Sequence, residues 1–264
     1  MRIGIITGSG TYALPDFEGA EAVEVATEFG PATLTEGRFA GADVLHVSRH
    51  LPGHQRLSHQ VSHQANIAAL RDRGADAILA VTVCGAVDRD VALGSLIVFD
   101  DLHFLANRLP DGSICTLHTE PGRPGRGHWI YESPFSAALR RALLDGAAEA
   151  GLAARDGGCY GHVDGPRFNT KAEIRMLASC GVTAVSQTAG PETVLAGEAG
   201  IPFALLGYAT DYANGVQEVT APVEDLIALV QASPAAFAAV LTAAVPRVQA
   251  ATDLAPVGSH FRFD

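Results

Sequence analysis

Cysteine is scarce in this sequence, and no two cysteines form a CxxC pair. The four that occur are scattered along the 264 residues, at Cys84, Cys115, Cys159 and Cys180. Scattered cysteines are typical of reduced thiols rather than of a disulfide framework. We therefore expect a cytoplasmic protein.

Basic residues and long apolar runs are also few. Lysine and arginine number 18 against 29 acidic residues, which gives a net charge of −11. This balance argues against nucleic acid as a partner, so an anionic substrate would need a few local cations to capture it. The apolar stretches are interrupted by Asp, Arg or Gly, and Met1-Arg2 opens into a short strand rather than a charged leader. We therefore expect no membrane partner.

The chain does have enough apolar residues for a large core. Hydrophobic residues make up 48% of the sequence and charged residues 18%. This length and composition predict a single α/β domain over residues 1–264, with buried subunit interfaces as well.

Short apolar runs alternate with helical patterns along the chain. The apolar runs predict strands at residues 3–6, 44–47, 77–83, 96–99, 182–185 and 203–206, with hairpins over residues 21–48. Helical spacing predicts helices at residues 64–72, 191–200, 223–231 and 234–248, and one that begins at Ser133-Pro134. The alternation indicates a β-sheet core flanked by helices. Residues 107–127 predict a mobile loop, and the residues from Asp253 onward a tail.

The first strand runs directly into Gly8-Ser9-Gly10. Two glycines around a serine let backbone N–H groups and a hydroxyl turn toward an anion such as phosphate. The same residues fit a dinucleotide fingerprint, but that needs a helix after the glycines, and Pro15 interrupts one. A small-anion loop, a dinucleotide site and a turn without a ligand all remain open here.

Four histidines, His50, His54, His59 and His63, lie close together in the sequence. Their spacing suggests the hypothesis of a metal site. Against it, no carboxylate or cysteine lies among them, and Pro52-Gly53 breaks the helix that would align the first pair. We favour Arg49-His50 as an anion clamp, in which the guanidinium grips phosphate and the imidazole adds a donor. A surface Arg-His pair in a loop is the alternative.

Further polar residues follow predicted strands or precede predicted helices. Thr82 ends a buried strand, Thr188 lies near a helix N-terminus that suits an anion, and Asp211 follows an apolar strand as a potential acid or base. Phe168 could stack on a planar base, and Asn169 could bond to it. Each also has a structural interpretation: a core threonine, a core phenylalanine, or an aspartate that caps a turn.

The order of these motifs resembles the trimeric purine nucleoside phosphorylase and 5′-methylthioadenosine phosphorylase family. The likeness is carried by GSG (8–10), RH (49–50), QANIAAL (64–70), TVCGA (82–86), GPRFNTKAE (165–173), PETVLAGEAGI (191–201) and ATDY (209–212). It implies a central mixed, partly barrel-like β-sheet flanked by helices and a homotrimer. It also implies cleavage of a purine nucleoside by inorganic phosphate, giving the free base and a sugar 1-phosphate, with no metal and no cofactor besides phosphate as co-substrate.

The resemblance also implies roles for individual residues. It assigns the phosphate site to Ser9, Arg49, His50, Thr82, Val83 and Thr188. It assigns the base and ribose site to Cys84, Gly85, Phe168, Asn169, Gln187, Asp211 and Ala213, and gives His128 to a neighbouring subunit's 5′ pocket. Asp211 and His50 would be the catalytic residues, with a protonated Asp211 donating to the purine N7.

Asp211 also favours a 6-aminopurine, because an aspartate can accept from the 6-amino group. Three residues depart from the family's methylthioadenosine branch: Ala213 replaces a second aspartate, Gln187 a methionine under the ribose, and Asn169 a serine. The resemblance therefore implies 5′-methylthioadenosine or a related 5′-modified nucleoside as substrate. The alternatives are a 6-oxopurine nucleoside such as inosine, guanosine or methylthioinosine, a hydrolytic nucleosidase, and a nucleoside-binding protein without catalysis.

Overall fold

A computed structural model describes residues 1–131, 133–218, 221–252, 254–255 and 258–264. Its main sheet has 11 strands, and its central path runs β2-β3-β4-β1-β5-β11-β10-β7. These strands are β1 (Arg2–Thr7), β2 (Glu18–Thr27), β3 (Gly30–Phe39), β4 (Ala42–Ser48), β5 (Ala77–Ala86), β7 (Asp101–His103), β10 (Cys159–His162) and β11 (Val182–Ser186). Off this path lie β6 (Leu96–Val98), β9 (Ala154–Asp156) and β12 (Phe203–Tyr212). The sheet contains parallel and antiparallel pairs, so the predicted central mixed sheet is confirmed.

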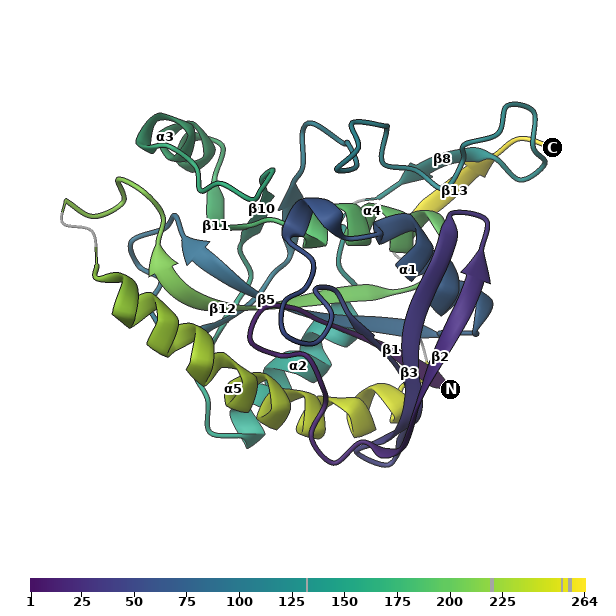
Figure 1. Ribbon diagram of the computed structural model, residues 1–264, viewed down its shortest axis with the longest axis horizontal. Coiled ribbons are helices and arrows are strands. Elements are labelled where there is room, and N and C mark those ends of the chain that lie inside the picture. Colours follow the sequence, from purple (N-terminus) through teal and green to yellow (C-terminus); the bar gives the residue numbers. More distant parts are fainter. Residues whose placement is uncertain (132, 219–220, 253, 256–257) are drawn as a thin grey trace.

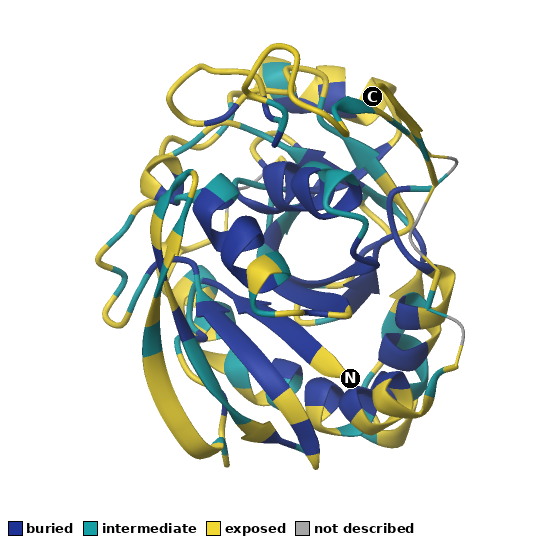
Figure 2. Cartoon of the chain, turned by 90° about the vertical axis from the view of Figure 1, so that its right-hand side faces the viewer, coloured by how far each residue is buried: buried dark blue, intermediate teal, exposed yellow. Residues whose placement is uncertain are grey.

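Helices cover both faces of the sheet (Figure 1). On one face lie α2 (Ala137–Glu149) and α5 (Val223–Ala250), and on the other α1 (His63–Asp72) and α4 (Ala189–Glu198). The helix α3 (Lys171–Ser179) packs beside β11, and a short 3₁₀ helix, η1 (Ser58–Gln60), precedes α1. The two faces hold separate apolar clusters, and Figure 2 shows the buried residues gathered on the central strands and the inward sides of the helices.

The strand β5 changes its neighbour halfway along one edge. Its residues Ala77–Ala80 pair in parallel with β1, whereas Gly85 and Ala86 pair antiparallel with β11. The other edge pairs with β12 over almost its whole length. Residues 81–84 therefore lie at a seam where β1 and β11 diverge, which is the kind of place where α/β sheets bind ligands.

All six predicted strands are present, and so are the hairpins, as β2, β3 and β4. The helix that a dinucleotide fingerprint needs directly after the glycines is therefore replaced by strands, which excludes that interpretation. The predicted helix at Ser133-Pro134 begins later, at Ala137 with Ser136 as N-cap. The Ser133 hydroxyl instead bonds to the Asp100 carbonyl, which fixes the chain outside the helix.

The two closing helices predicted at residues 223–231 and 234–248 are one continuous helix, α5. Pro234 has no N–H for the carbonyl of Val230, and the Ser233 hydroxyl donates to that carbonyl at 2.8 Å instead. By length and composition α5 could cross a membrane, so the statement that Asp, Arg or Gly interrupts the apolar stretches was wrong for this helix. Its residues Phe237 and Leu241 are buried in the core beside α2. An apolar composition of this kind is also typical of a helix that packs in the core of a protein.

The predicted tail also contains structure. Residues Ser259–Arg262 form β13, which pairs antiparallel with β8 (Gly127–Ile130) in a separate two-stranded sheet. Asp253 itself lies outside the described residues. The mobility of residues 107–127 stays a prediction.

Candidate active site

A cavity of about 310 Å³ opens at the seam of the sheet. Every residue that the sequence placed in the site lines it except His128: Ser9, Arg49, His50, Thr82, Val83, Cys84, Gly85, Phe168, Asn169, Gln187, Thr188, Asp211 and Ala213. Its volume is in the range of pockets that hold small ligands. Residues from the two ends of the chain therefore meet in one place.

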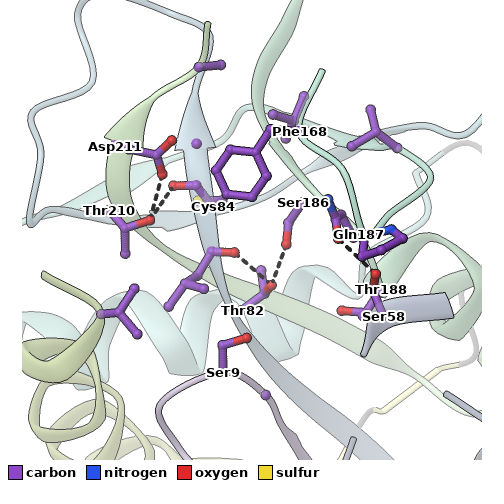
Figure 3. A pocket seen from close by; sticks show the side chains of 18 of the residues that line it. Ser9, Ser58, Thr82, Cys84, Phe168, Ser186, Gln187, Thr188, Thr210 and Asp211 are labelled. Atoms are coloured by element: carbon purple, nitrogen blue, oxygen red, sulfur yellow. Dashed lines mark hydrogen bonds between the residues drawn. The ribbon is translucent and has the colours of Figure 1, made fainter. Parts of the chain in front are cut away.

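The Gly8–Gly10 turn forms one wall of the cavity (Figure 3). The Thr11 amide donates to the Gly8 carbonyl at 3.0 Å, which closes the turn after β1. Gly10 has a φ of +80°, and a Cβ there would lie 2.9 Å from the carbonyl oxygen of Val230 on α5. Only glycine tolerates both the positive φ and the close approach of the Val230 carbonyl. Gly10 therefore lets the turn that carries Ser9 pack against α5.

Hydroxyl groups from two further elements lie on the same cavity. The Oγ1 of Thr82, inside β5 rather than at its end, is 3.1 Å from the Oγ of Ser186. Thr188 is the N-cap of α4 and its side chain makes no capping hydrogen bond. The helix therefore presents its positive N-terminal end and a hydroxyl toward the cavity, as an anion site requires.

Arg49 is buried and already has partners in the protein. Its Nε and Nη2 donate to the two carboxylate oxygens of Glu192 at 2.5 and 2.7 Å, and its Nη1 donates to the Val81 carbonyl at 2.6 Å. The sequence did not reveal this ion pair, because Glu192 lies far from Arg49 along the chain. The predicted clamp is therefore a guanidinium with only part of its donors left for an anion.

His50 has a hydrogen-bond partner within the protein. Its Nδ1 is 2.8 Å from the Arg56 carbonyl, an acceptor, so we assign the ring proton to Nδ1. Burial, together with the charge of Arg49, lowers the pKa of His50 to about 4. The ring is therefore neutral near pH 7, and Nε2 is left as an acceptor. The predicted contact of this imidazole with the anion stays a prediction.

The histidines do not gather around a common point for a metal. The rings of His50 and His54 stack with their centroids 4.3 Å apart, and His54 Nδ1 bonds to the Tyr12 hydroxyl. Among the described residues, no group of three or more His, Cys, Asp or Glu side chains could hold a metal ion.

The opposite end of the cavity carries a partly buried carboxyl group. Asp211 lies in β12 just after a register shift opposite β5, and the Thr210 hydroxyl donates to its Oδ1 at 2.8 Å (Figure 3). Such irregularities often aim a side chain into an active site. Burial raises the pKa of Asp211 above its usual value, although the bond from Thr210 opposes this. A carboxyl group of this kind can hold a proton and donate it.

Cys84 is the neighbour of Asp211 in this part of the cavity. Burial raises the pKa of its thiol, the nearby Asp211 carboxylate adds to this, and the sulfur contacts the Tyr208 carbonyl. The thiol is therefore protonated and lines the cavity as an unreactive side chain.

The loop over the cavity is anchored at its end. Thr170 and Glu173 form a capping box at the start of α3, and Asn169 donates weakly to Glu173 at 3.3 Å. Phe168 is 62% exposed, so it is not the core residue of the alternative interpretation. Its ring lies free at the mouth of the cavity, where a planar base could stack on it.

Gln187 connects this loop to η1. Its Oε1 accepts from the Ser58 hydroxyl at 2.8 Å, and its Nε2 donates to the Arg167 carbonyl at 3.0 Å. An apolar methionine could form neither bond.

Sequence reasoning missed several residues that line the cavity. Among them are Ser58, Ser186, Thr210, Leu226 and Val230. Ser186 and Thr210 adjoin predicted site residues, and this proximity was a usable signal. Leu226 and Val230 lie four residues apart on one face of α5, but nothing in the sequence says that this face borders the cavity.

His128 lies on β8, away from this cavity. It lines a second cavity of about 570 Å³ together with Leu105, Trp129 and Tyr131. Its predicted role in a neighbouring subunit's site therefore stays a prediction.

The chain is similar to known proteins along almost its whole length. A family model described as the phosphorylase superfamily matches residues 2–246. A probable 6-oxopurine nucleoside phosphorylase of Moorella thermoacetica is 30% identical over 249 residues, which are 94% of this chain and 94% of that protein. The S-methyl-5′-thioadenosine phosphorylase of Danio rerio is 32% identical over 214 residues, covering 80% of this chain and 76% of that protein. The solved methylthioadenosine phosphorylase of Schistosoma mansoni in complex with adenine has a TM-score of 0.86 and 27% identity, covering 95% of this chain and 92% of that one.

Proposed function

This chain belongs to the phosphorylase superfamily, and from that premise we propose that it cleaves a purine nucleoside with orthophosphate. The products are the free purine and a sugar 1-phosphate. One observation carries the proposal: a single cavity has a hydroxyl-lined helix N-terminus at one end and a partly buried carboxyl group with a raised pKa at the other.

Orthophosphate would occupy the end formed by Ser9, Thr82 and Thr188. Hydroxyl groups and the α4 N-terminus favour an anion there, and the free N–H groups of Arg49 add charge-assisted bonds. The neutral His50 would accept a hydrogen bond from the protonated oxygen of hydrogen phosphate. This bond would turn the unprotonated oxygens toward the anomeric carbon.

Bond cleavage passes through an oxocarbenium-like state. Phosphate oxygens held beneath the sugar stabilise that positive charge and then attack C1′, so the carbon–nitrogen bond breaks and a carbon–oxygen bond forms. The departing purine takes the electron pair of the broken bond. A protonated Asp211 donates its proton to N7, and Phe168 stacks on the base.

We infer 5′-methylthioadenosine or a related 5′-modified nucleoside as substrate. Leu226 and Val230 give the cavity an apolar part that suits a thioether better than a hydroxyl. An ionised or protonated Asp211 can also accept from a 6-amino group.

A 6-oxopurine nucleoside is the second candidate. The Asn169 amide borders the cavity and could donate to a 6-oxo group. The similarity to the Moorella thermoacetica protein also favours it.

We further infer a homotrimer in which His128 reaches a neighbour's cavity. The exposed apolar side chains of Leu105, Ile130 and Phe261 support a subunit contact on that side of the molecule.

Light scattering would measure the number of subunits. A His128→Ala variant with reduced affinity for a 5′-methylthio substrate would support the assignment, and unchanged affinity would contradict it. A cytoplasmic location remains a prediction.

The decisive experiment measures base release from adenosine, inosine, guanosine, methylthioadenosine and methylthioinosine, with and without orthophosphate. We expect release only with phosphate and fastest with methylthioadenosine. Equal release without phosphate would indicate a hydrolytic nucleosidase, and binding without release would indicate a nucleoside-binding protein. Faster release from the inosine compounds would select the 6-oxopurine alternative.

A further inference from the structure

We propose that Glu192 is a positioning residue for the phosphate end of the cavity, acting through Arg49. The inference rests on the proposed function, because it concerns the same anion site. Glu192 does not line the cavity, and its effect on an anion would be transmitted by the guanidinium that it holds.

The contact between the two side chains is a bidentate ion pair without access to water. The side chain of Arg49 is 0% exposed and that of Glu192 is 1% exposed. Both carboxylate oxygens accept from the guanidinium, and the Val81 carbonyl accepts a third N–H. A guanidinium has five N–H donors, so one remains on Nη1 and one on Nη2. Because the planar group is fixed on two sides, the direction of these two donors is fixed as well.

Gly8 lies so close to the Arg49 guanidinium that there is no room for a side chain between them. A Cβ at Gly8 would lie 2.8 Å from Nη1 of Arg49. The guanidinium therefore packs directly against the turn that carries Ser9. A small rotation of Arg49 would collide with that turn or withdraw its donors from the cavity.

Glu192 also joins the two halves of the anion site. Arg49 directly follows β4, whereas Glu192 lies in the first turn of α4, four residues after the N-cap Thr188. The ion pair thus sets the distance between the guanidinium and the helix N-terminus. A carboxylate in the first turn is also favoured by the helix dipole.

The remaining neighbour of the pair is His63. Its Nδ1 is 3.8 Å from Glu192, and neither ring nitrogen has a hydrogen-bond partner within the described part of the chain. Burial lowers the pKa of His63 well below its usual value, and the charge of Arg49 lowers it further. The ring is therefore uncharged, and Arg49 is the counter-ion of Glu192.

The test is calorimetric titration of inorganic phosphate into the intact protein, combined with steady-state kinetics. Glu192→Asp keeps the charge but is one methylene shorter, so it cannot hold the same bidentate geometry. Loss of a charge-assisted hydrogen bond is expected to weaken phosphate binding about tenfold or more, and to raise the KM for phosphate equally. The KM for the nucleoside should not change. Unchanged phosphate affinity in a folded Glu192→Asp protein would overturn the proposal.

Glu198→Gln is the matched control. Glu198 lies on the same helix, but its carboxylate accepts from Thr116 and Leu117 at the second cavity. This variant should leave phosphate binding unchanged. An equal loss in both variants would indicate a general disturbance of α4 and contradict the specific role.

A double variant, compared with the Arg49→Met single variant, tests the route through Arg49. Replacing both members of a buried ion pair with apolar groups is often tolerated, whereas removal of one is not. In the Arg49→Met background, adding Glu192→Met should therefore weaken phosphate binding no further. A further loss would mean that Glu192 acts by another route. If the wild type binds phosphate but releases no base, the proposed function fails while the role of Glu192 in anion binding stands.

Discussion

The Ser233 hydroxyl replaces the backbone donor that Pro234 lacks, and this substitution can be measured. Ser233 is fully buried, and its Oγ donates to the Val230 carbonyl at 2.8 Å. Ser233→Ala leaves that carbonyl without a partner, which costs about 1–3 kcal/mol. For a chain of this size, each kcal/mol lowers the Tm by about 2–4 °C.

The reasoning requires that the cost depend on Pro234. In a Pro234→Ala background, the amide of residue 234 can donate to the Val230 carbonyl, so Ser233→Ala should cost less than about 0.5 kcal/mol. Urea unfolding of the four proteins, with a constant m value, gives the coupling free energy. An equal cost of Ser233→Ala in both backgrounds would refute the explanation.

Ser179 supplies a matched control for this cycle. Its hydroxyl donates to the Met176 carbonyl at 2.7 Å, again three residues back in a helix, but it is exposed. The Cys180 amide also donates to that carbonyl. Ser179→Ala should therefore change the unfolding free energy little. A loss as large as that of Ser233→Ala would show that the serine geometry alone, without proline, accounts for the effect.

Further predictions concern catalysis, the turn and acid stability. Asp211→Asn should lower kcat without lowering the Tm. Wild-type activity should be present below the raised pKa of Asp211 and fall above it, because only the protonated carboxyl group can donate. A pH–rate profile with no such fall would contradict proton donation. Gly10→Ala should raise the phosphate KM and destabilise the protein, since φ is +80° and Val230 lies 2.9 Å from the new Cβ; wild-type phosphate kinetics would contradict this. The folded-state pKa of His46 is lowered by burial to about 4 from 6.5, so unfolding takes up a proton between these values and stability falls as pH falls through that window. The loss approaches about 3 kcal/mol near pH 4, and urea unfolding of His46→Gln should show a correspondingly flatter dependence.

The sequence predicted those parts of the site that depend on local chemistry. A glycine-serine-glycine turn after a strand, a threonine in a buried strand and a carboxyl group after an apolar run each carry a local signal. The structure brings Ser9, Thr82 and Asp211 to one cavity. Strand positions were predicted for the same reason, because an apolar run indicates a buried strand without any information from distant residues.

The features that the sequence did not predict depend on partners far along the chain. The pairing of Arg49 with Glu192 joins β4 to α4, and no spacing rule connects them. The contact of His50 Nδ1 with the Arg56 carbonyl, from which the position of the ring proton is assigned, depends on the course of the turn. The sequence predicted a separate helix beginning at Pro234, whereas the Ser233 bond that compensates for the missing donor of this proline appears only in three dimensions.

The place where β5 changes partners has a consequence for how new substrate preferences could arise. The proposed anion end is built from strand and helix backbone that also holds the fold together, so we expect it to tolerate few replacements. The nucleoside end is completed by the loop with Phe168 and by the first turns of α5. Exchanges in those outer segments can change which purine or sugar substituent is accepted while the inherited phosphorolytic machinery stays intact. A single ancestral scaffold could in this way give rise to enzymes that differ in substrate but share one reaction.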